Sequence, residues 1–198
     1  MPKSHDNLTD ADLVRAVGSG DRDAYAILVD RHLPGVHAVA MRITCDAAAA
    51  QDIAQDVFVR AYERLYLFDG NHPFRNWLLK IATNLSLNHL RSRQRERILH
   101  LRAAEAREDS AGDRREAPDI PGPQEWKHWL GQLDETQRTV IVLFHFHEMP
   151  YTEIADVLDV PLNTVRTHLH RARKRLRELM TAGSTRENGK WNVARSNG

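Results

Sequence analysis

Apolar residues recur along most of this chain at the spacing of an α-helix. Leu13, Val14 and Val17 form one set, and further sets follow through residues 22–43, 47–68, 75–97 and 126–180. No segment shows the sustained period of two that is typical of a strand. The pattern therefore predicts an all-α protein.

The breaks between these apolar sets carry helix-start and turn signals. Gly18–Asp21 (GSGD) predicts a turn and a cap between the first two helices, and Asp46 is a candidate cap for a helix that runs to Phe68. The stretch Phe68–Phe74 (FDGNHPF) contains Gly and Pro, which predicts a loop before a long helix that begins near Arg75.

The helical pattern is lost between the two halves of the chain. Residues 108–124 hold three of the eight prolines and two of the ten glycines among acidic and basic residues, which is typical of a linker. The sequence therefore predicts two small helical domains, 1–98 and 126–180, joined by a flexible linker, 99–125. The remaining residues, 181–198, are expected to form a disordered tail.

The second domain contains a helix-turn-helix pattern. A short apolar helix ends at Asp159-Val160-Pro161, because proline disfavours helical geometry in the residue before it. Asn163 or Thr164 is then expected to cap a second helix. That helix has a continuous apolar stripe formed by Val165, Leu169, Ala172, Leu176 and Leu179.

The other face of this second helix is basic. Arg166, Thr167, His170, Arg171, Arg173 and Lys174 all lie off the stripe. A helix of this kind suits the major groove of DNA, where arginine reads guanine. The alternative is an exposed amphipathic helix that binds an acidic protein or a lipid, but the preceding short helix and turn favour DNA.

Charge is unevenly distributed although the net charge is only +1. The successive net charges are −4 over 1–73, +6 over 74–107, −3 over 108–132, −5 over 133–160 and +5 over 161–180. Two separate DNA-binding faces and an acidic face for another partner would explain this alternation, and unevenly charged solvated helices would too. In the free protein, the opposite charges are expected to attract across the linker and partly mask the DNA-binding faces.

Composition and motifs argue against a membrane protein and an enzyme. The amino-terminal residues are polar, the apolar runs fall short of the ~20 residues of a membrane span, and Cys45 is the single cysteine, so a cytoplasmic protein is expected. Two His-x-His pairs, at 145/147 and 168/170, invite a metal site. On a helix such residues lie about 200° apart, however, so neither a metal nor a cofactor is expected.

Residues 133–177 closely resemble region four of extracytoplasmic-function sigma factors, and residues 51–98 resemble region two. The resemblance implies a non-enzymatic subunit that directs RNA polymerase core to promoters. It implies a helix-turn-helix that reads the minus-thirty-five element and a region-two bundle that opens and reads the minus-ten element. Pro150 stands where the family often has a capping Ser, so the first helix of the motif is expected to begin at Thr152.

The resemblance also assigns residues to each surface. For the minus-thirty-five element it implies base contacts from Arg166, Thr167, His170 and Arg171, and phosphate contacts from Thr164, Arg173 and Lys174. For the minus-ten element, Phe68, Asn71, His72 and Phe74 would surround a flipped base, and Lys80, Asn84, Asn88, Arg91 and Arg95 share one helix face. The polymerase-binding set is Asp52, Gln55, Asp56, Phe58 and Arg60. Trp77 is ambiguous, and core packing is favoured at least as much as DNA contact.

The implied partners are RNA polymerase core, through the clamp of its largest subunit and the flap of its second-largest, promoter DNA, and an anti-sigma factor. A stand-alone helix-turn-helix regulator is the alternative. Such a regulator needs a sensor or dimerisation domain, and residues 1–98 show neither a strand pattern nor a heptad seam.

Overall fold

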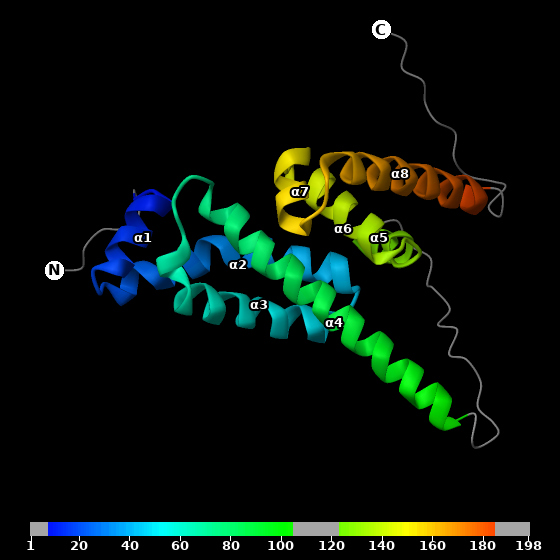
Figure 1. The fold of residues 1–198 in the computed structure, drawn as a ribbon, viewed down its shortest axis with the longest axis horizontal. Coiled ribbons are helices and arrows are strands. Elements are labelled where there is room, and N and C mark those ends of the chain that lie inside the picture. The colour runs from blue at the N-terminus through cyan, green and yellow to red at the C-terminus, as the bar shows by residue number, and fades with distance from the viewer. Residues whose placement is uncertain (1–7, 105–122, 185–198) are drawn as a thin grey trace, which may run out of the picture.

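The computed structural model describes residues 8–104 and 123–184, and the regular elements within those ranges are all helical. The first domain contains α1 (Asp10–Gly18), α2 (Arg22–Thr44), α3 (Ala47–Glu63), the short 3₁₀ helix η1 (Leu65–Leu67) and α4 (Phe74–Ala104). The second contains α5 (Pro123–Gly131), α6 (Glu135–Ile141), the π-helical segment η2 (Val142–Phe146), α7 (Tyr151–Leu158) and α8 (Leu162–Ser184). The prediction of an all-α fold in two helical domains is confirmed (Figure 1).

The helices of the first domain begin where short polar side chains satisfy free backbone N–H groups. Thr9 and Asp12 form a capping box at α1, and Asp21 accepts hydrogen bonds from the backbone of Asp23 and Ala24 at α2. Asp46 does the same for Ala48 and Ala49, which confirms its predicted role as the cap of α3. These caps fix where α2 and α3 turn back on each other.

The first core forms where α2, α3 and α4 pack together, with α1 against α2. Leu28, Ile43, Val57, Leu78 and Ala82 are all fully buried there. Burying a leucine or isoleucine side chain contributes about 1.5–3 kcal/mol, so this apolar interior is the main stabilising term.

The second core is built around α6, α7 and α8. Ile141, Leu143, Met149, Ile154 and Val165 are at most 2% exposed in it. Backbone N–H of Met149 donates to the Leu143 carbonyl, which closes the turn between η2 and α7.

Several predicted boundaries are wrong. The helix expected to reach Phe68 ends at Glu63, because the backbone tightens into η1. The motif's first helix begins at Tyr151 rather than Thr152. Its second helix begins at Leu162, with the Thr164 N–H donating to the Pro161 carbonyl, so neither Asn163 nor Thr164 is the cap.

Helical structure also extends beyond the predicted domain limits. It continues to residue 104, resumes at residue 123 and runs to residue 184, so both ends of the predicted linker and the start of the predicted tail are helical. The rest of the linker and the tail lie outside the described residues. Within the described ranges, no helix is both long and apolar enough to cross a membrane.

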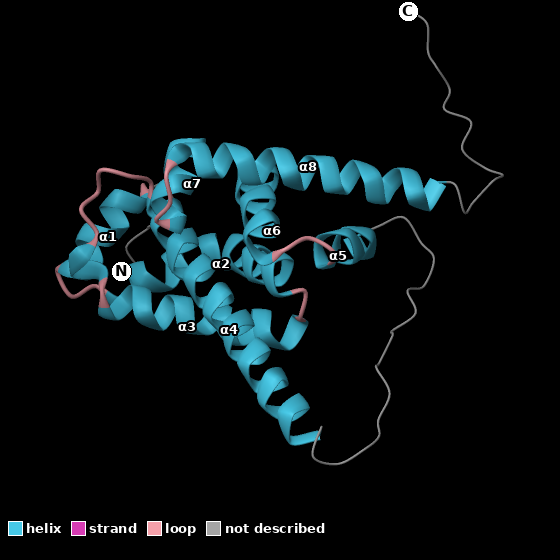
Figure 2. Cartoon of the chain, turned by 45° about the vertical axis from the view of Figure 1, so that its right-hand side comes forward, coloured by secondary structure: helices cyan, strands magenta, loops and turns pink. Residues whose placement is uncertain are grey.

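The two domains pack against each other. Helix α2 contacts α5, α6 and η2, and α4 contacts α6 and α7, an arrangement that can be followed in Figures 1 and 2. Arg42, Arg75 and Arg138 supply side chains to this contact, and none of them belongs to the predicted DNA-binding sets. The two domains pack together as expected, but the expected masking of the DNA-binding faces is wrong. The charged and amide residues of those faces are exposed, and the polar interdomain contacts come from residues outside them.

Candidate nucleic-acid interface

The α7–α8 pair has the form of a helix-turn-helix. Asp159 ends α7 in the left-handed conformation, with φ of 54°, and its backbone N–H donates to the Ala155 carbonyl. The Val160 N–H donates to the same carbonyl at 3.1 Å. This tight turn fixes the orientation of α8 relative to α7, so one face of α8 points outward along its length.

The apolar stripe of α8 faces the core as predicted. Val165, Leu169, Ala172 and Leu176 are buried, and Leu179 is half-buried. The residues predicted to read or hold the minus-thirty-five element lie on the outer face: Arg166, Thr167, His170, Arg171, Arg173 and Lys174 are exposed, and Thr164 is half-buried. The structure thus brings this set together on one helix face.

Three members of this set also have partners within the protein. Arg166 Nη1 donates to the side-chain oxygen of Asn163 at 3.4 Å. The Thr167 hydroxyl donates to the Asn163 carbonyl at 2.9 Å, which leaves its oxygen lone pairs as acceptors. Arg173 Nε donates to His145 Nε2 at 3.2 Å, and its guanidinium lies 5.1 Å from the centre of the Phe144 ring. Burial, followed by the Arg173 charge, lowers the pKa of His145, so a neutral imidazole accepts this hydrogen bond. Arg173 is therefore positioned by its own domain.

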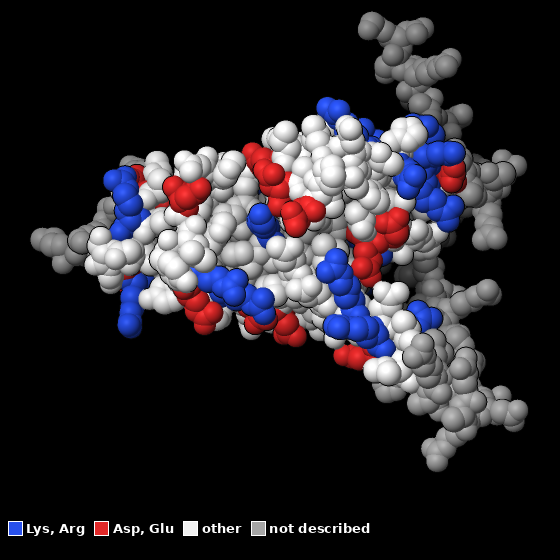
Figure 3. Space-filling view, in the orientation of Figure 1, with Lys and Arg blue, Asp and Glu red and all other residues white. Residues whose placement is uncertain are grey.

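The outer face of α4 carries the second predicted set. Lys80, Asn84, Asn88, Arg91 and Arg95 are all exposed, whereas Leu78, Ala82 and Leu85 on the opposite face are buried. Figure 3 shows basic side chains over the distal part of α4 and over α8, with acidic side chains between them. The charge separation expected from the sequence is therefore present on the surface.

The loop between η1 and α4 forms one wall of a cavity of about 360 Å³. Phe68, Asn71, His72 and Phe74 of the predicted base-capturing set all line it, together with Gly70 and Pro73. Asp69 accepts hydrogen bonds from the backbone and side-chain amide of Asn71, and these bonds lower the pKa of Asp69. The loop is thus held in a turn by its own side chains.

Sequence reasoning missed the opposite wall of this cavity. Thr9, Asp10 and Ala11 from the start of α1 complete its lining. Asp10 accepts a hydrogen bond from Arg31 at 2.6 Å and lies 2.8 Å from His32 Nε2, which fixes α1 to α2. No short-range pattern could have revealed this wall, because the two sides of the cavity lie about sixty residues apart in the sequence.

The loop packs on an aromatic cluster formed with the first turn of α4. Phe74 is 2% exposed, and its ring centre lies 5.3 Å from that of Phe68 and 5.6 Å from that of Trp77. The Trp77 ring is half-buried in this cluster, which favours a packing role for the residue that the sequence left ambiguous. Such aromatic contacts contribute about 0.5–1.5 kcal/mol each beyond simple burial.

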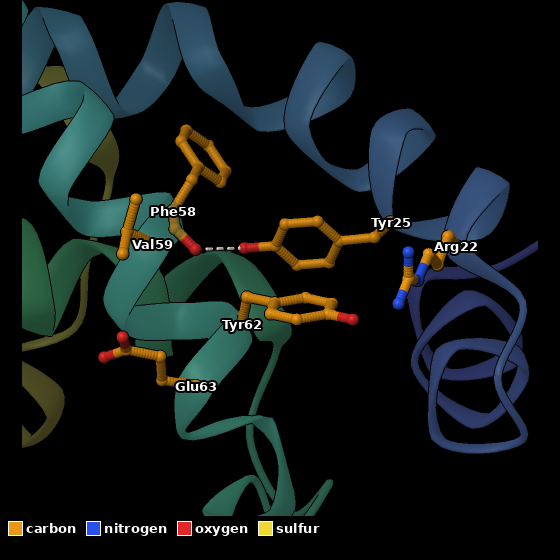
Figure 4. A pocket seen from close by; sticks show the side chains of 6 residues that line it. All are labelled: Arg22, Tyr25, Phe58, Val59, Tyr62 and Glu63. Atoms are coloured by element: carbon orange, nitrogen blue, oxygen red, sulfur yellow. Dashed lines mark hydrogen bonds between the residues drawn. The ribbon is translucent and has the colours of Figure 1, made fainter.

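Helix α3 presents the predicted polymerase-binding face. Asp52, Gln55, Asp56 and Arg60 are exposed on it, but Phe58 is only 6% exposed and points into the core. Its carbonyl accepts a hydrogen bond from the Tyr25 hydroxyl, as Figure 4 shows. Burial raises the pKa of Tyr25 to about 12, so this hydroxyl remains a donor.

Two exposed apolar residues of α3 were not in the predicted set. Val59 is 57% exposed and Tyr62 is 47% exposed, and both line a groove of about 560 Å³ with Arg22, Tyr25 and Glu63 (Figure 4). The Tyr62 ring meets that of Tyr25 edge to face at a centre distance of 4.9 Å. Val59 follows Gln55 by four residues and Tyr62 follows Val59 by three, so the helical spacing could have placed both on the face of Gln55.

The described residues contain no group of three His, Cys, Asp or Glu side chains that could hold a metal ion. Of the two His-x-His pairs, His145 contacts Arg173 and His147 contacts Arg75. The two histidines of the 145/147 pair therefore have different arginine partners. In the other pair, His168 is half-buried and His170 is exposed.

Comparison with known proteins assigns both domains. The family "Sigma-70 region 2" matches residues 28–96, and "Sigma-70, region 4" matches residues 124–176. The chain is 32% identical to the ECF RNA polymerase sigma factor SigW of Bacillus subtilis over 176 residues, which cover 84% of this chain and 94% of SigW. This chain belongs to the family of extracytoplasmic-function sigma factors. It is therefore a transcription initiation factor that directs RNA polymerase core to promoters.

Other relatives agree with this assignment. The sigma factor is 34% identical to the RNA polymerase sigma-H factor of Pseudomonas aeruginosa over 175 residues, which cover 83% of this chain and 90% of that protein. Its fold resembles that of CnrH in complex with the cytosolic domain of CnrY, with a TM-score of 0.64 and 29% identity over 87% of this chain and 97% of CnrH. The sigma factor RpoE in complex with the anti-sigma factor NepR from Bartonella quintana shares the fold at a TM-score of 0.61 and 24% identity, covering 81% of this chain and 97% of RpoE.

Proposed function

We propose that this sigma factor reads the two promoter elements with separate surfaces and docks on RNA polymerase core with a third. The observation that carries this proposal is that the charged and amide side chains of the three sets are exposed on different helices, α8, α4 and α3, each backed by a buried apolar face. A stand-alone regulator would have no use for the acidic face of α3.

The outer face of α8 is the proposed reader of the minus-thirty-five element. Arg166, Thr167, His170 and Arg171 would meet base edges in the major groove, where a bidentate arginine–guanine contact discriminates by about 1–3 kcal/mol. Thr164 and Lys174 are proposed to hold phosphates, with Arg173 held in place beside them by His145.

The cavity beside the minus-ten loop is the proposed site for an unstacked base. Its volume of about 360 Å³ and its mixed lining, which includes the aromatic Phe68 and Phe74 and the polar Asn71 and His72, suit a single nucleobase. Lys80, Asn84 and Asn88 continue from this cavity along α4, followed by Arg91 and Arg95, so the adjoining strand would lie along that helix.

Polymerase docking is proposed for the exposed face of α3, through Asp52, Gln55, Asp56 and Arg60. The structure supports replacing Phe58 in this set by Val59 and Tyr62, which present apolar surface on the same side. Charged residues around an exposed apolar patch are typical of a protein interface.

Two similar structures are complexes of a sigma factor with another protein, NepR or CnrY, and NepR is an anti-sigma factor. We propose that this chain also binds an anti-sigma factor, that it has no catalytic activity of its own, and that it acts in the cytoplasm with polymerase core.

The test is run-off transcription with purified core enzyme, together with co-elution of the chain and core. Asp56→Arg is expected to weaken core binding about tenfold, because it reverses a charge at the proposed interface. The matched control is Asp30→Arg, which reverses an exposed aspartate on α2, outside that face. If the Asp56→Arg variant folds and binds core as tightly as the control, the assignment of this face of α3 to polymerase binding is refuted. Tight selective binding of the free chain to duplex promoter, without co-elution with core, would instead support a stand-alone regulator.

A further inference from the structure

Segment η2 presents two adjacent aromatic side chains to α8. The Phe144 ring centre lies 5.1 Å from the Arg173 guanidinium, and His145 Nε2 accepts a hydrogen bond from Arg173 Nε at 3.2 Å. Phe144 is half-buried, whereas His145 and Arg173 are exposed. The ring attracts the cation, and the imidazole fixes the direction of the Nε–H bond. The two contacts together hold the guanidinium in one place.

The aromatic residues that contact Arg173 are themselves well supported. In η2 the Phe144 and His145 rings meet edge to face at a centre distance of 4.8 Å, and the Phe144 ring lies 5.0 Å from that of Tyr151 at the start of α7. Leu143, directly before Phe144, is fully buried in the second core. Single π-helical turns such as η2 are rare and are frequently found at functional sites.

The other end of the Arg173 guanidinium remains available. An arginine has five N–H donors, one on Nε and four on the two Nη atoms. His145 accepts from Nε, and within the described part of the chain neither Nη atom of Arg173 has a hydrogen-bond partner. Paired N–H groups of a guanidinium match the oxygens of a phosphate. One end of the guanidinium is therefore held by the protein while the other can bind an anion.

Arg173 is in line with residues that are proposed to read bases. It follows His170 by three positions and Arg166 by seven, so the three share a stripe on the outer face of α8. Phosphates flank every base pair of a major groove. A backbone phosphate is therefore the anion that this guanidinium would meet when α8 binds DNA.

Holding the side chain in advance favours DNA binding. An arginine that is free in solution loses rotamer freedom when it binds a phosphate, and immobilising one such side chain weakens binding by about three- to tenfold. In this chain Phe144 and His145 hold Arg173 in the absence of DNA. That loss of freedom has therefore already occurred on folding.

We infer that Phe144 and His145 are positioning residues of the minus-thirty-five reader, which hold Arg173 so that its two Nη groups bind one phosphate of the DNA backbone. The inference rests on the proposed role of α8 and deepens it. A phosphate contact fixes the register of the helix but carries no sequence information. Loss of the positioning residues is therefore expected to weaken binding to all upstream sequences alike and to leave the base preference unchanged.

A small set of variants separates positioning from a structural role. His145→Ala removes the acceptor, and His145→Gln keeps a side-chain oxygen that can accept from Arg173 Nε. Phe144→Leu removes the ring and keeps apolar volume, and Arg173→Ala removes the guanidinium itself. The control is His128→Ala, because His128 is an exposed histidine of the same domain that bonds to Gln132 instead.

The experiment uses holoenzyme assembled from polymerase core and the full chain, after circular dichroism has verified the helix content of each variant. Binding is titrated at several salt concentrations on two promoter fragments that differ only in the minus-thirty-five element. His145→Ala and Phe144→Leu are expected to weaken binding about three- to tenfold on both fragments. His145→Gln is expected to restore most of the affinity, and the control should equal the wild-type chain.

The double variant His145→Ala with Arg173→Ala tests whether His145 acts through Arg173. Arg173→Ala alone should weaken binding and lower the slope of log affinity against log salt concentration by about one, because one phosphate contact is lost. A residue that acts only through Arg173 has no effect once that side chain is gone, so the double variant should bind as tightly as Arg173→Ala. A general loss of structure would instead add to the effect of Arg173→Ala.

Two results would overturn the inference alone. One is a folded His145→Ala variant that binds as tightly as the control while Arg173→Ala is weakened. The other is an effect of His145→Ala that persists in the Arg173→Ala background. If His145→Ala fails to fold, Phe144→Leu provides the same comparisons. Unchanged affinity and salt slope in Arg173→Ala would instead refute the proposed phosphate contact of α8, and the inference with it.

Discussion

Acidification is expected to weaken the interdomain contact through His147. This imidazole is 6% exposed, and its Nδ1 lies 2.9 Å from Arg75 Nη2, an arrangement that requires neutral Nδ1 as the acceptor. Burial, followed by the charges of Arg75 and Arg42, lowers the pKa of His147 to about 4. An exposed histidine titrates near pH 6.5.

The sign and size of the effect follow from these two values. Because the pKa is lower in the folded protein, protons bind more readily when His147 is exposed. The contribution of neutral His147 is therefore complete above about pH 6.5 and is lost as the pH falls toward 4. A difference of about 2.5 units corresponds to about 3 kcal/mol in total, of which about 2 kcal/mol is lost between pH 7 and pH 5.

Urea unfolding at pH 7 and pH 5 measures this loss in the wild-type chain and in His147→Gln. Glutamine keeps an acceptor for Arg75 but does not titrate, so the loss in the variant is expected to be smaller by about 2 kcal/mol. The other ten histidines are common to both proteins, and their contribution cancels in the difference. Equal losses in the two proteins would refute the assignment of a neutral, buried His147 at the interface.

Three further outcomes are expected. Arg171→Ala should relax selectivity in the minus-thirty-five element and cost about 1–3 kcal/mol there by footprinting, whereas Arg175→Ala, which removes a neighbour of Glu178, should not. Asn84→Ala or Asn88→Ala should instead reduce permanganate reactivity at the minus-ten element, and a footprint defect identical to that of Arg171→Ala would contradict separate readers. Leu169→Ala should lower the free energy of unfolding by about 2–5 kcal/mol in urea, because that side chain is 2% exposed in the second core.

The fold was predictable from the sequence where its causes are local. The Asp46 side chain caps α3 through N–H groups two and three residues away, and the stripe from Val165 to Leu176 is buried because its spacing matches the helix period. The predicted helix boundaries were wrong where another local geometry satisfies the backbone N–H groups equally well. At Leu162 a backbone carbonyl, that of Pro161, serves the first turn in place of the Asn163 or Thr164 side chain.

The candidate sites were predictable to the extent that they face solvent. An exposed basic or amide strip on a helix, such as Asn84 to Arg95, is visible as a polar face opposite an apolar one. Phe58 was misplaced because an aromatic residue beside acidic ones suits either an interface or a core, and only packing against α2 decides between them. Val59, one position later, takes the exposed place.

The contacts between the two domains could not be predicted from the sequence. Arg138 is the one basic residue in an acidic stretch, and its sequence neighbours give no sign that its partner is the Ile43 carbonyl 95 residues away. A backbone carbonyl has no side-chain signature, so no complementary residue can be sought in the sequence. A buried guanidinium is costly unless it is well compensated. In this protein Arg138 donates to the Leu133 carbonyl of its own domain and to the Ile43 carbonyl at the end of a helix in the other, so the position of one domain determines whether a charge in the other is fully satisfied.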